Sequence, residues 1–273
     1  MITSESNSQI KDIIKLQKNI KHRKKVSAFI AEGVKLLLEA AAHNKIKKIY
    51  VSESLYNGNH KEGVDLSSDI KLLLSKNPYE IVADDIFKKV SDTVTTQGIL
   101  GIVSLPEYSI DSIISDKRHM WLLLDDLRDP GNLGTIIRTA EGAGMSGVIM
   151  SKGTVDLFNP KTVRSTMGAI FRVPYVYVED ILSAIDMIKK AGYNVYGTAM
   201  KGSILYDKAD YANGAGIVIG NEANGISGRV FDNITDSICI PMEGELESLN
   251  AAVSAAIVMY EAARQRRKVC KKL

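Results

Sequence analysis

Polar residues able to do chemistry gather in three loops of the C-terminal half, each of which follows an apolar run. The first loop, Asp-Pro-Gly-Asn-Leu-Gly-Thr-Ile-Ile-Arg, covers residues 129–138. Asn132 can cap the helix that begins here, and Arg138 follows about one and a half turns later. An unpaired guanidinium among the apolar neighbours of Arg138 would be unfavourable, so we expect a carboxylate or a phosphate as its partner. The alternative is an ordinary strand–helix junction with a solvated arginine.

The second loop delivers a carboxylate to the end of a strand. Residues 216–226 read Gly-Ile-Val-Ile-Gly-Asn-Glu-Ala-Asn-Gly-Ile, so Glu222 follows a wholly apolar strand and lies between glycines. A carboxylate in such a place is usually paired or part of a site. Arg138 is its expected partner, and the pairing could be structural or functional.

The third loop, residues 240–250, leads from a strand into a helix of small residues. Ser248 is a suitable N-cap for this helix, which we expect to extend to residue 268. Alanines at positions 251, 252, 255 and 256 permit close backbone approach on nearly every side. Such a helix is either threaded through its surroundings or docked on another helix.

Residues 142–147, Gly-Ala-Gly-Met-Ser-Gly, match the GxGxxG pattern of dinucleotide-binding oxidoreductases. That site needs the glycines after a strand and at the start of a helix, where helix amides meet the pyrophosphate. Here the pattern closes a predicted helix and precedes a strand. A left-handed helix C-cap and a tight turn explain the glycines better.

The periodicity of the chain predicts two α/β domains: a small one in residues 1–106, a linker at 107–118, and a second domain in residues 119–273. The linker is polar and follows a helix-breaking proline. The second domain begins with a near-continuous apolar run at 121–127, and strands and helices then alternate, which predicts a mostly parallel sheet with helices on both faces. Because ligands bind beyond the carboxyl ends of such strands, loops at 128–134, 198–203, 220–227 and 241–250 should meet at one edge.

A basic run marks the N-terminal domain. A helix is expected over residues 8–22, and four basic residues at its end, Lys21, Arg23, Lys24 and Lys25, are candidates for RNA binding. Clustered cations gain affinity for nucleic acid by releasing its counterions. The alternative is a solvated helix face.

Bulk properties narrow the function classes. The net charge of +3 permits an RNA partner without demanding one. Cys239 and Cys270 form no CxxC pair, which argues against a zinc site or a disulfide framework, so we expect no metal. The N-terminus lacks the apolar core of a signal peptide, and no apolar run approaches the roughly 20 residues of a membrane span. We therefore expect a cytoplasmic protein without a membrane partner.

Taken together and in order, the three loops resemble those of SpoU-type (TrmH-like) RNA ribose 2′-O-methyltransferases of the SPOUT superfamily. The resemblance spans residues 119–266 and rests on DPGNLGTIIRTA, GIVIGNEANGI and IPMEGELESLNAAVSAAIVMYE. The first domain, through SQIKDIIKLQKNIKHRKK and SAFIAEGVKLLLEA, is similar to the substrate-binding domain that many such enzymes carry, and that domain resembles RNA-binding ribosomal proteins.

The resemblance implies a deep C-terminal trefoil knot, a homodimer, and transfer of a methyl group from S-adenosylmethionine to a ribose 2′-hydroxyl of RNA without a metal. Large-subunit (23S) ribosomal RNA is the favoured substrate; transfer RNA, or a non-catalytic RNA-binding role, is the alternative. The cofactor-binding residues implied are Thr198, Ala199, Gly202, Ile219, Gly220, Asn221, Glu222, Ile240, Met242, Ser248, Leu249 and Asn250.

The catalytic residues implied by the resemblance are Asn132, Arg138, Glu222, Ser248 and Asn250. Guanidinium stays protonated in proteins, so Arg138 is expected to orient the adjacent phosphate and stabilise charge on the ribose oxygen rather than act as a base. Glu222 is expected to fix Arg138, and the two asparagines to position the substrate and the loops.

Overall fold

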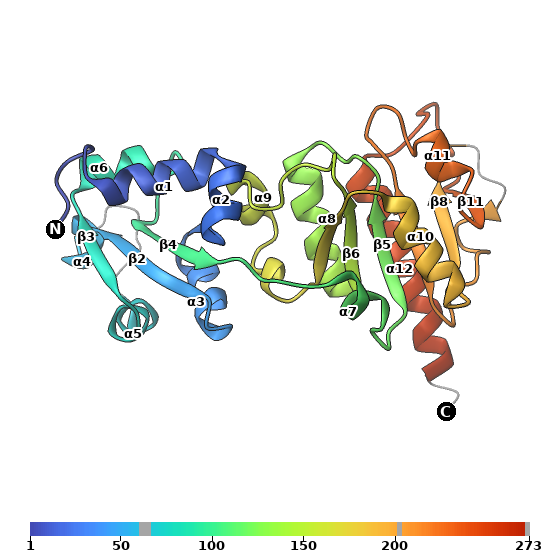
Figure 1. Cartoon of the computed structure of the whole chain (residues 1–273), viewed down its shortest axis with the longest axis horizontal. Coiled ribbons are helices and arrows are strands. Elements are labelled where there is room, and N and C mark those ends of the chain that lie inside the picture. Colours follow the sequence, from blue (N-terminus) through green and yellow to red (C-terminus); the bar gives the residue numbers. More distant parts are fainter. Residues whose placement is uncertain (60–66, 201–203, 271–273) are drawn as a thin grey trace. The chain divides into compact units, whose positions relative to one another are not determined.

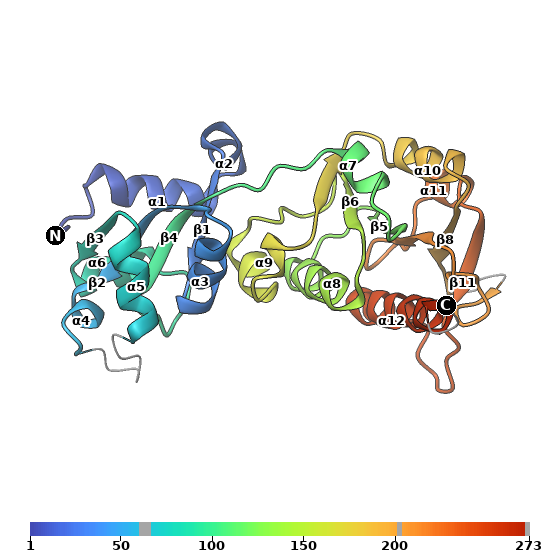
Figure 2. The ribbon, with the colours of Figure 1, turned by 90° about the horizontal axis from the view of Figure 1, so that it is seen from below.

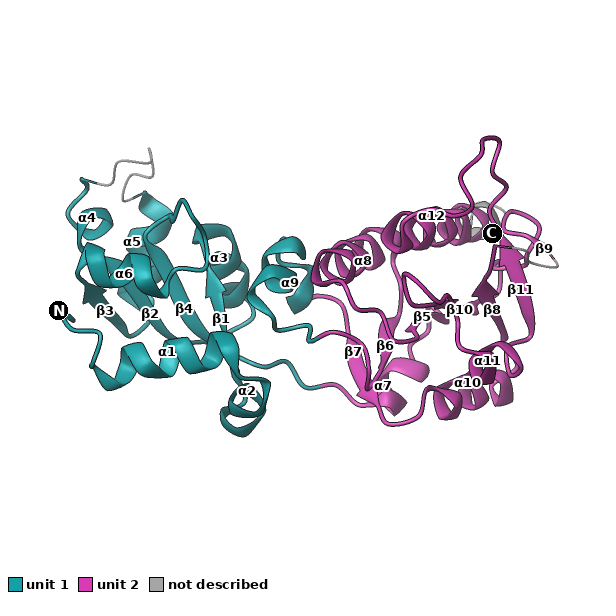
Figure 3. Ribbon diagram, turned by 90° about the horizontal axis from the view of Figure 1, so that it is seen from above, with its two compact units in different colours: residues 1–107, 156–171 teal, residues 108–155, 172–273 magenta. Residues whose placement is uncertain are grey.

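The computed structural model describes residues 1–59, 67–200 and 204–270, with the side chains of 268–270 excepted. The chain forms two compact α/β units (Figures 1 and 3). Unit 1 comprises Met1–Glu107 and Asp156–Phe171, and unit 2 comprises Tyr108–Val155 and Arg172–Leu273. The predicted fold class, a small α/β domain followed by a larger one with a parallel sheet, is confirmed.

Unit 1 is a four-stranded sheet with helices on both faces. In spatial order its strands are β1 (Ala28–Glu32), β4 (Ile99–Ser104), β2 (Ile46–Ser52) and β3 (Tyr79–Val82). The pairs β1–β4 and β4–β2 are antiparallel, and β2–β3 is parallel. The helices from the first part of the chain are α1 (Ser8–Lys18), α2 (Ile20–Val26), α3 (Val34–Ala42), α4 (Glu53–Tyr56), α5 (Ser68–Lys76) and α6 (Asp84–Val90).

The helix predicted over residues 8–22 is interrupted at Asn19. Asn19 has an extended backbone (φ −124°, ψ 104°), and its side chain accepts a hydrogen bond from the amide of His22 at 3.0 Å. Asparagine is a favoured N-cap because it satisfies an amide that a new helix leaves unpaired. The basic run therefore forms a second helix, α2, rather than the end of the first.

Residues 156–171 pack in unit 1 although the sequence placed them in the second domain. The segment contains α9 (Pro160–Ser165) and a 3-10 turn, η1 (Ala169–Phe171). Its Phe158 ring lies 4.7 Å from that of Phe29 on β1, centroid to centroid. The segment belongs to unit 1 because burying such aromatic side chains against β1 is strongly favourable.

Arg23 fastens the same segment to α1 and α2. Its guanidinium forms an ion pair with Asp156 and donates hydrogen bonds to the carbonyl oxygens of Leu16 and Gln17. The residue is only 5% exposed. Arg23 is therefore a buried structural arginine, unlike its exposed neighbours in α2.

Unit 2 is a seven-stranded sheet in which every pair of neighbouring strands is parallel. In spatial order the strands are β7 (Tyr175–Val178), β6 (Gly147–Ser151), β5 (Met120–Leu124), β10 (Ala215–Ile219), β8 (Asn194–Thr198), β11 (Asp236–Cys239) and β9 (Ile204–Leu205). All residues of the central strands β5 and β10 are buried, as their apolar composition predicted.

Helices cover both faces of this sheet. The pair α8 (Pro130–Ala143) and α12 (Ala251–Cys270) lies on one face, and α7 (Ile110–Ile114), α10 (Ile181–Lys190) and α11 (Gly228–Phe231) lie on the other (Figures 2 and 3). Because the strands are parallel, the loops that follow β5, β10, β8 and β11 leave from one edge. Among the helices of the described residues, none is long and apolar enough to cross a membrane.

The predicted linker at 107–118 contains the short helix α7. Ile113 is 1% exposed, and its carbonyl oxygen accepts a hydrogen bond from the Trp121 indole nitrogen at 2.8 Å. A buried indole N–H needs such a partner, so Trp121 holds the segment against the sheet.

The glycine hexamer at residues 142–147 has the predicted role: Gly144 (φ 71°, ψ 38°) is the left-handed C-cap of α8.

We predict that Arg23→Gln lowers the free energy of unfolding by about 3–5 kcal/mol, because it leaves Asp156 as an uncompensated, largely buried charge. Thermal unfolding of the full chain measures the effect. Lys24→Gln, one residue away on the exposed face of α2, is the matched control and should unfold at the wild-type temperature. Equal unfolding temperatures for the two variants would contradict a structural role for Arg23.

Candidate active site

The loops after β5 and β10 are joined by Glu222. Its carboxylate accepts hydrogen bonds from the backbone amides of Arg128 at 3.0 Å and of Asp129 at 2.9 Å, the two residues directly before α8. The Asn132 side-chain amide donates a third, at 3.0 Å. The amino end of a helix favours a negative charge because its first amides lack partners within the helix.

These contacts decide the charge of Glu222. Partial burial alone would raise the pKa of its carboxyl, but the hydrogen bonds from Asn132, Asp129 and Arg128 outweigh burial and hold the pKa below its usual value. The ionised carboxylate therefore contributes stability at neutral pH, and this contribution is lost as the pH falls through the lowered folded-state pKa.

Asn132 bridges two loops instead of capping α8 as predicted. The cap is Asp129, whose side chain accepts a hydrogen bond from the Asn132 backbone amide at 2.7 Å. The Asn132 side chain thus donates to Glu222, and its oxygen accepts a hydrogen bond from the Asn250 side chain at 2.9 Å. One side-chain amide therefore links the loops that follow β5, β10 and β11.

Asn250, rather than the predicted Ser248, caps α12. Its side-chain oxygen accepts hydrogen bonds from the amides of Ala252 at 2.9 Å and Val253 at 3.3 Å. The same residue therefore begins α12 with its oxygen and holds Asn132 with its nitrogen. Ser248 precedes the helix and lines a cavity instead.

Arg138 does not pair with Glu222, which corrects the sequence-based expectation. Arg138 is exposed, and the described residues provide it with neither an ion pair nor a hydrogen bond. The geometry of α8 explains this, because each residue advances about 100° around a helix and six residues separate Arg138 from Asn132. Its neighbours Ile136 and Ile137 are buried on the face toward the sheet, whereas Arg138 points to solvent.

The loop after β10 folds back tightly on itself. Asn221 and Gly225 exchange two backbone hydrogen bonds of 2.9 Å, and the Asn221 side chain donates to the Asp126 carbonyl oxygen, also at 2.9 Å. A Cβ atom on Gly220 would lie 2.1 Å from the Gly225 carbonyl carbon, so only glycine fits there. The backbone is thus brought close to the space beside the loop.

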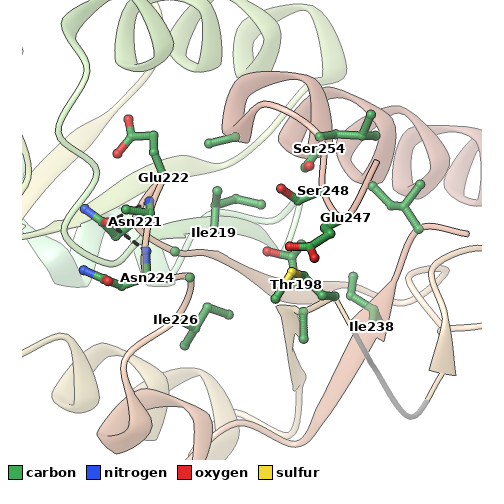
Figure 4. Close-up of a pocket in the computed structure, with 18 of the residues that line it drawn as sticks. Thr198, Ile219, Asn221, Glu222, Asn224, Ile226, Ile238, Glu247, Ser248 and Ser254 are labelled. Carbon is green, nitrogen blue, oxygen red and sulfur yellow. Dashed lines mark hydrogen bonds between the residues drawn. The ribbon is translucent and has the colours of Figure 1, made fainter. Parts of the chain in front are cut away.

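That space is a cavity of about 340 Å³ at the carboxyl ends of β8, β10 and β11 (Figure 4). The size lies within the usual range for small-molecule sites. Of the predicted cofactor-binding residues, those that line it are Thr198, Ala199, Ile219, Gly220, Asn221, Glu222, Ile240, Met242, Ser248 and Leu249. Asn250 is not among the lining residues, and Gly202 lies outside the described residues.

The other lining residues were not named individually from the sequence, although several lie in the loops 198–203, 220–227 and 241–250 that were expected to meet at this edge. They are Met200, Ala223, Asn224, Gly225, Ile226, Phe231, Ile238, Glu247, Ala251 and Ser254. Some carried a usable signal: Glu247 directly precedes Ser248, and Ser254 lies one helical turn after Asn250. Phe231 carried none, because it lies in α11 just after the second loop, where an apolar residue in a short helix is equally explained by ordinary core packing.

The four predicted RNA-binding residues do not share one environment. Lys21, Lys24 and Lys25 are exposed, and the described part of the chain supplies no ion pair to any of them. Arg23 is buried against Asp156, so its guanidinium is not available to RNA.

In the described residues, no group of three or more His, Cys, Asp or Glu side chains could hold a metal.

Comparisons with known proteins agree with this geometry. The SpoU rRNA Methylase family matches residues 119–260, and the MRM3-like substrate binding domain matches residues 7–101. The 23S rRNA (guanosine(2553)-2'-O)-methyltransferase RlmP of Bacillus subtilis is 34% identical over 259 residues, which cover 95% of this chain and 97% of the relative.

Solved structures show the same fold along almost the whole chain. The SpoU methyltransferase AviRb from Streptomyces viridochromogenes, in complex with AdoMet, has a TM-score of 0.85 at 27% identity and covers 96% of this chain and 98% of its own. The AdoMet-bound rRNA methyltransferase from Sinorhizobium meliloti has a TM-score of 0.82 at 31% identity, over 96% and 97%. With its loops, its fold and its sequence in agreement, the chain belongs to the SpoU rRNA methylase family.

Proposed function

We propose that this protein transfers the methyl group of S-adenosylmethionine to a ribose 2′-hydroxyl in large-subunit ribosomal RNA. The observation that carries the proposal is the hydrogen-bonded chain Glu222–Asn132–Asn250, which fixes three loops around one cavity. The named activity of the Bacillus subtilis relative supports both the 2′-O position and the ribosomal substrate.

The cavity fits an adenosine-containing cofactor. Apolar side chains, among them Ile219, Ile226 and Ile238, can cover the faces of an adenine ring, and Gly220 lets the backbone approach closely. Polar groups at another part of the wall, from Thr198, Ser248 and Ser254, can hydrogen-bond the amino-acid end of the cofactor. When bound, S-adenosylmethionine supplies an activated methyl group on its sulfonium.

The chain's own residues must place the 2′-hydroxyl in line with that methyl group and stabilise the charge that develops on its oxygen. Arg138 is exposed and has no ion pair or hydrogen bond among the described residues, so its guanidinium can hold the phosphate next to the target ribose. Glu222 fixes the 128–132 loop rather than Arg138. Asn132 and Asn250 hold the loops in register, and Ser248 presents its hydroxyl to the cavity.

RNA would also bind unit 1, through Lys21, Lys24 and Lys25. Their exposed ammonium groups follow one another on α2, and Lys11, Lys15 and Lys18 are exposed on α1. Such a surface can release counterions from several phosphates at once. The match of residues 7–101 to a substrate-binding domain supports this role.

The protein would act in the cytoplasm as a homodimer. The outer face of α12 supports the dimer, because Val253 and Tyr260, two turns apart, are 46% and 48% exposed although both are large and apolar.

We also propose that the chain forms the deep trefoil knot of its family, with α12 following the loop after β11. An experimental structure in which the C-terminal segment does not pass through a loop of the backbone would contradict the knot. Recovery of the protein with membranes would contradict the cytoplasmic location.

We predict that Arg138→Ala reduces methyl transfer by two orders of magnitude or more, because the phosphate and the developing charge lose their cation. Labelled S-adenosylmethionine and large-subunit ribosomal RNA measure the transfer, and calorimetry should show nearly unchanged cofactor affinity. Arg128→Ala, which removes another exposed arginine just before α8, is the control and should retain most of the activity. Retained turnover in Arg138→Ala would contradict the assignment.

We predict that Lys21→Gln, Lys24→Gln and Lys25→Gln together weaken RNA binding and reduce the slope of log K against log salt by about 2–3, one phosphate contact being lost per lysine. Filter binding across a salt series measures the slope. The control combines Lys71→Gln, Lys76→Gln and Lys190→Gln, which remove equal charge from other exposed positions. Equal slopes for the two triple variants would show that the lysines of α2 are solvated and do not contact RNA.

We predict that the protein sediments as a dimer at micromolar concentration and that Val253→Arg shifts it to a monomer, because the new charge would have to be buried in the interface. Analytical ultracentrifugation measures both masses. Ser183→Arg, on an exposed position of α10 across the sheet, should stay dimeric. A monomeric wild-type protein would contradict the homodimer.

A further inference from the structure

The cavity carries an unusual charge for a site that would bind an adenosine compound. Among its described lining residues, the ionisable side chains are Glu222 and Glu247, and none is a lysine, arginine or histidine. Most ligands built on adenosine in cells carry phosphates, which such a wall repels. A wall whose described residues carry negative charge and no cation instead favours a ligand with positive charge.

The two carboxylates differ in what they already bind. Glu222 accepts hydrogen bonds from two backbone amides and from Asn132, so its charge is stabilised by the protein itself. Glu247 is exposed, and within residues 1–59, 67–200 and 204–270 it has neither a hydrogen bond nor an ion pair. Glu247 is therefore the carboxylate that is free to meet a ligand.

The surroundings of Glu247 show which part of a ligand it would meet. Figure 4 places it among Thr198, Ser248 and Ser254, with Glu222 at another part of the wall. The hydroxyls of Ser248 and Ser254 can donate hydrogen bonds to a carboxylate, whereas Glu247 can only accept them. A carboxylate acceptor beside hydroxyl donors matches the two charged groups of an amino acid.

We propose that Glu247 binds the ammonium group of the amino-acid part of S-adenosylmethionine and so selects a zwitterionic adenosine compound over phosphorylated ones. The inference rests on the proposed function. An ammonium group offers three N–H donors to a carboxylate, and such charge-assisted bonds are stronger than neutral ones. A sulfonium offers no N–H, so it would gain less from the same contact.

Three probes separate the possible roles of Glu247 in the full-length protein. S-Adenosylmethionine has both the ammonium and the sulfonium, S-adenosylhomocysteine has only the ammonium, and 5′-methylthioadenosine has neither. Calorimetry with Glu247→Gln should show affinities for the first two compounds lower by about 10- to 100-fold, as for a lost charge-assisted bond, and an unchanged affinity for the third.

Glu245→Gln is the matched control, because Glu245 lies in the same loop and is exposed but does not line the cavity. It should leave all three affinities unchanged. A loss confined to S-adenosylmethionine would assign Glu247 to the sulfonium and overturn the proposal. An equal loss for all three compounds, or no loss for any, would also overturn it. If the wild-type protein itself bound neither S-adenosylmethionine nor S-adenosylhomocysteine, the proposed function would fail first.

Discussion

The side-chain amide of Asn132 is the contact on which the site depends. Its nitrogen donates to Glu222 and its oxygen accepts from Asn250, so one planar group fixes the distance between loops that are 90 and 118 residues away along the chain. An amide suits this position because it carries a donor and an acceptor at once. An aspartate could not donate to Glu222, and its charge would repel that carboxylate.

The bridge is possible only because other residues cap the two helices of the site. Asp129 caps α8, so the side chain of Asn132 is not needed as a cap. Asn250 caps α12 with its side-chain oxygen and donates to Asn132 with its side-chain nitrogen. The parallel sheet supplies the rest of the arrangement, since β5, β10 and β11 all end at one edge. Caps and sheet direction together leave Ser248 and Glu247 free to face the cavity.

Unit 1 uses charge for two purposes within a single short helix. In α2, Arg23 is buried and joins the segment 156–171 to α1 and α2, while Lys21, Lys24 and Lys25 remain exposed. A guanidinium can be buried here because it has a carboxylate and two carbonyl partners. Helical periodicity separates the roles, because α1 and β1 lie on one side of α2 and solvent on the other.

The sequence by itself determined the features that depend on near neighbours. Apolar runs predicted the buried strands β5 and β10, the glycine hexamer predicted the C-cap at Gly144, and three ordered motifs predicted most residues of the cavity wall. It did not predict β3, which is short and only partly buried. Only the tertiary structure decided which of two possible caps each helix uses, that Glu222 meets Asn132 rather than Arg138, and that Arg23 is buried against a carboxylate 133 residues away. The physical reason is that periodicity and capping act within a few residues, whereas the partner of a charge depends on which distant segments the folded sheet brings to the same place.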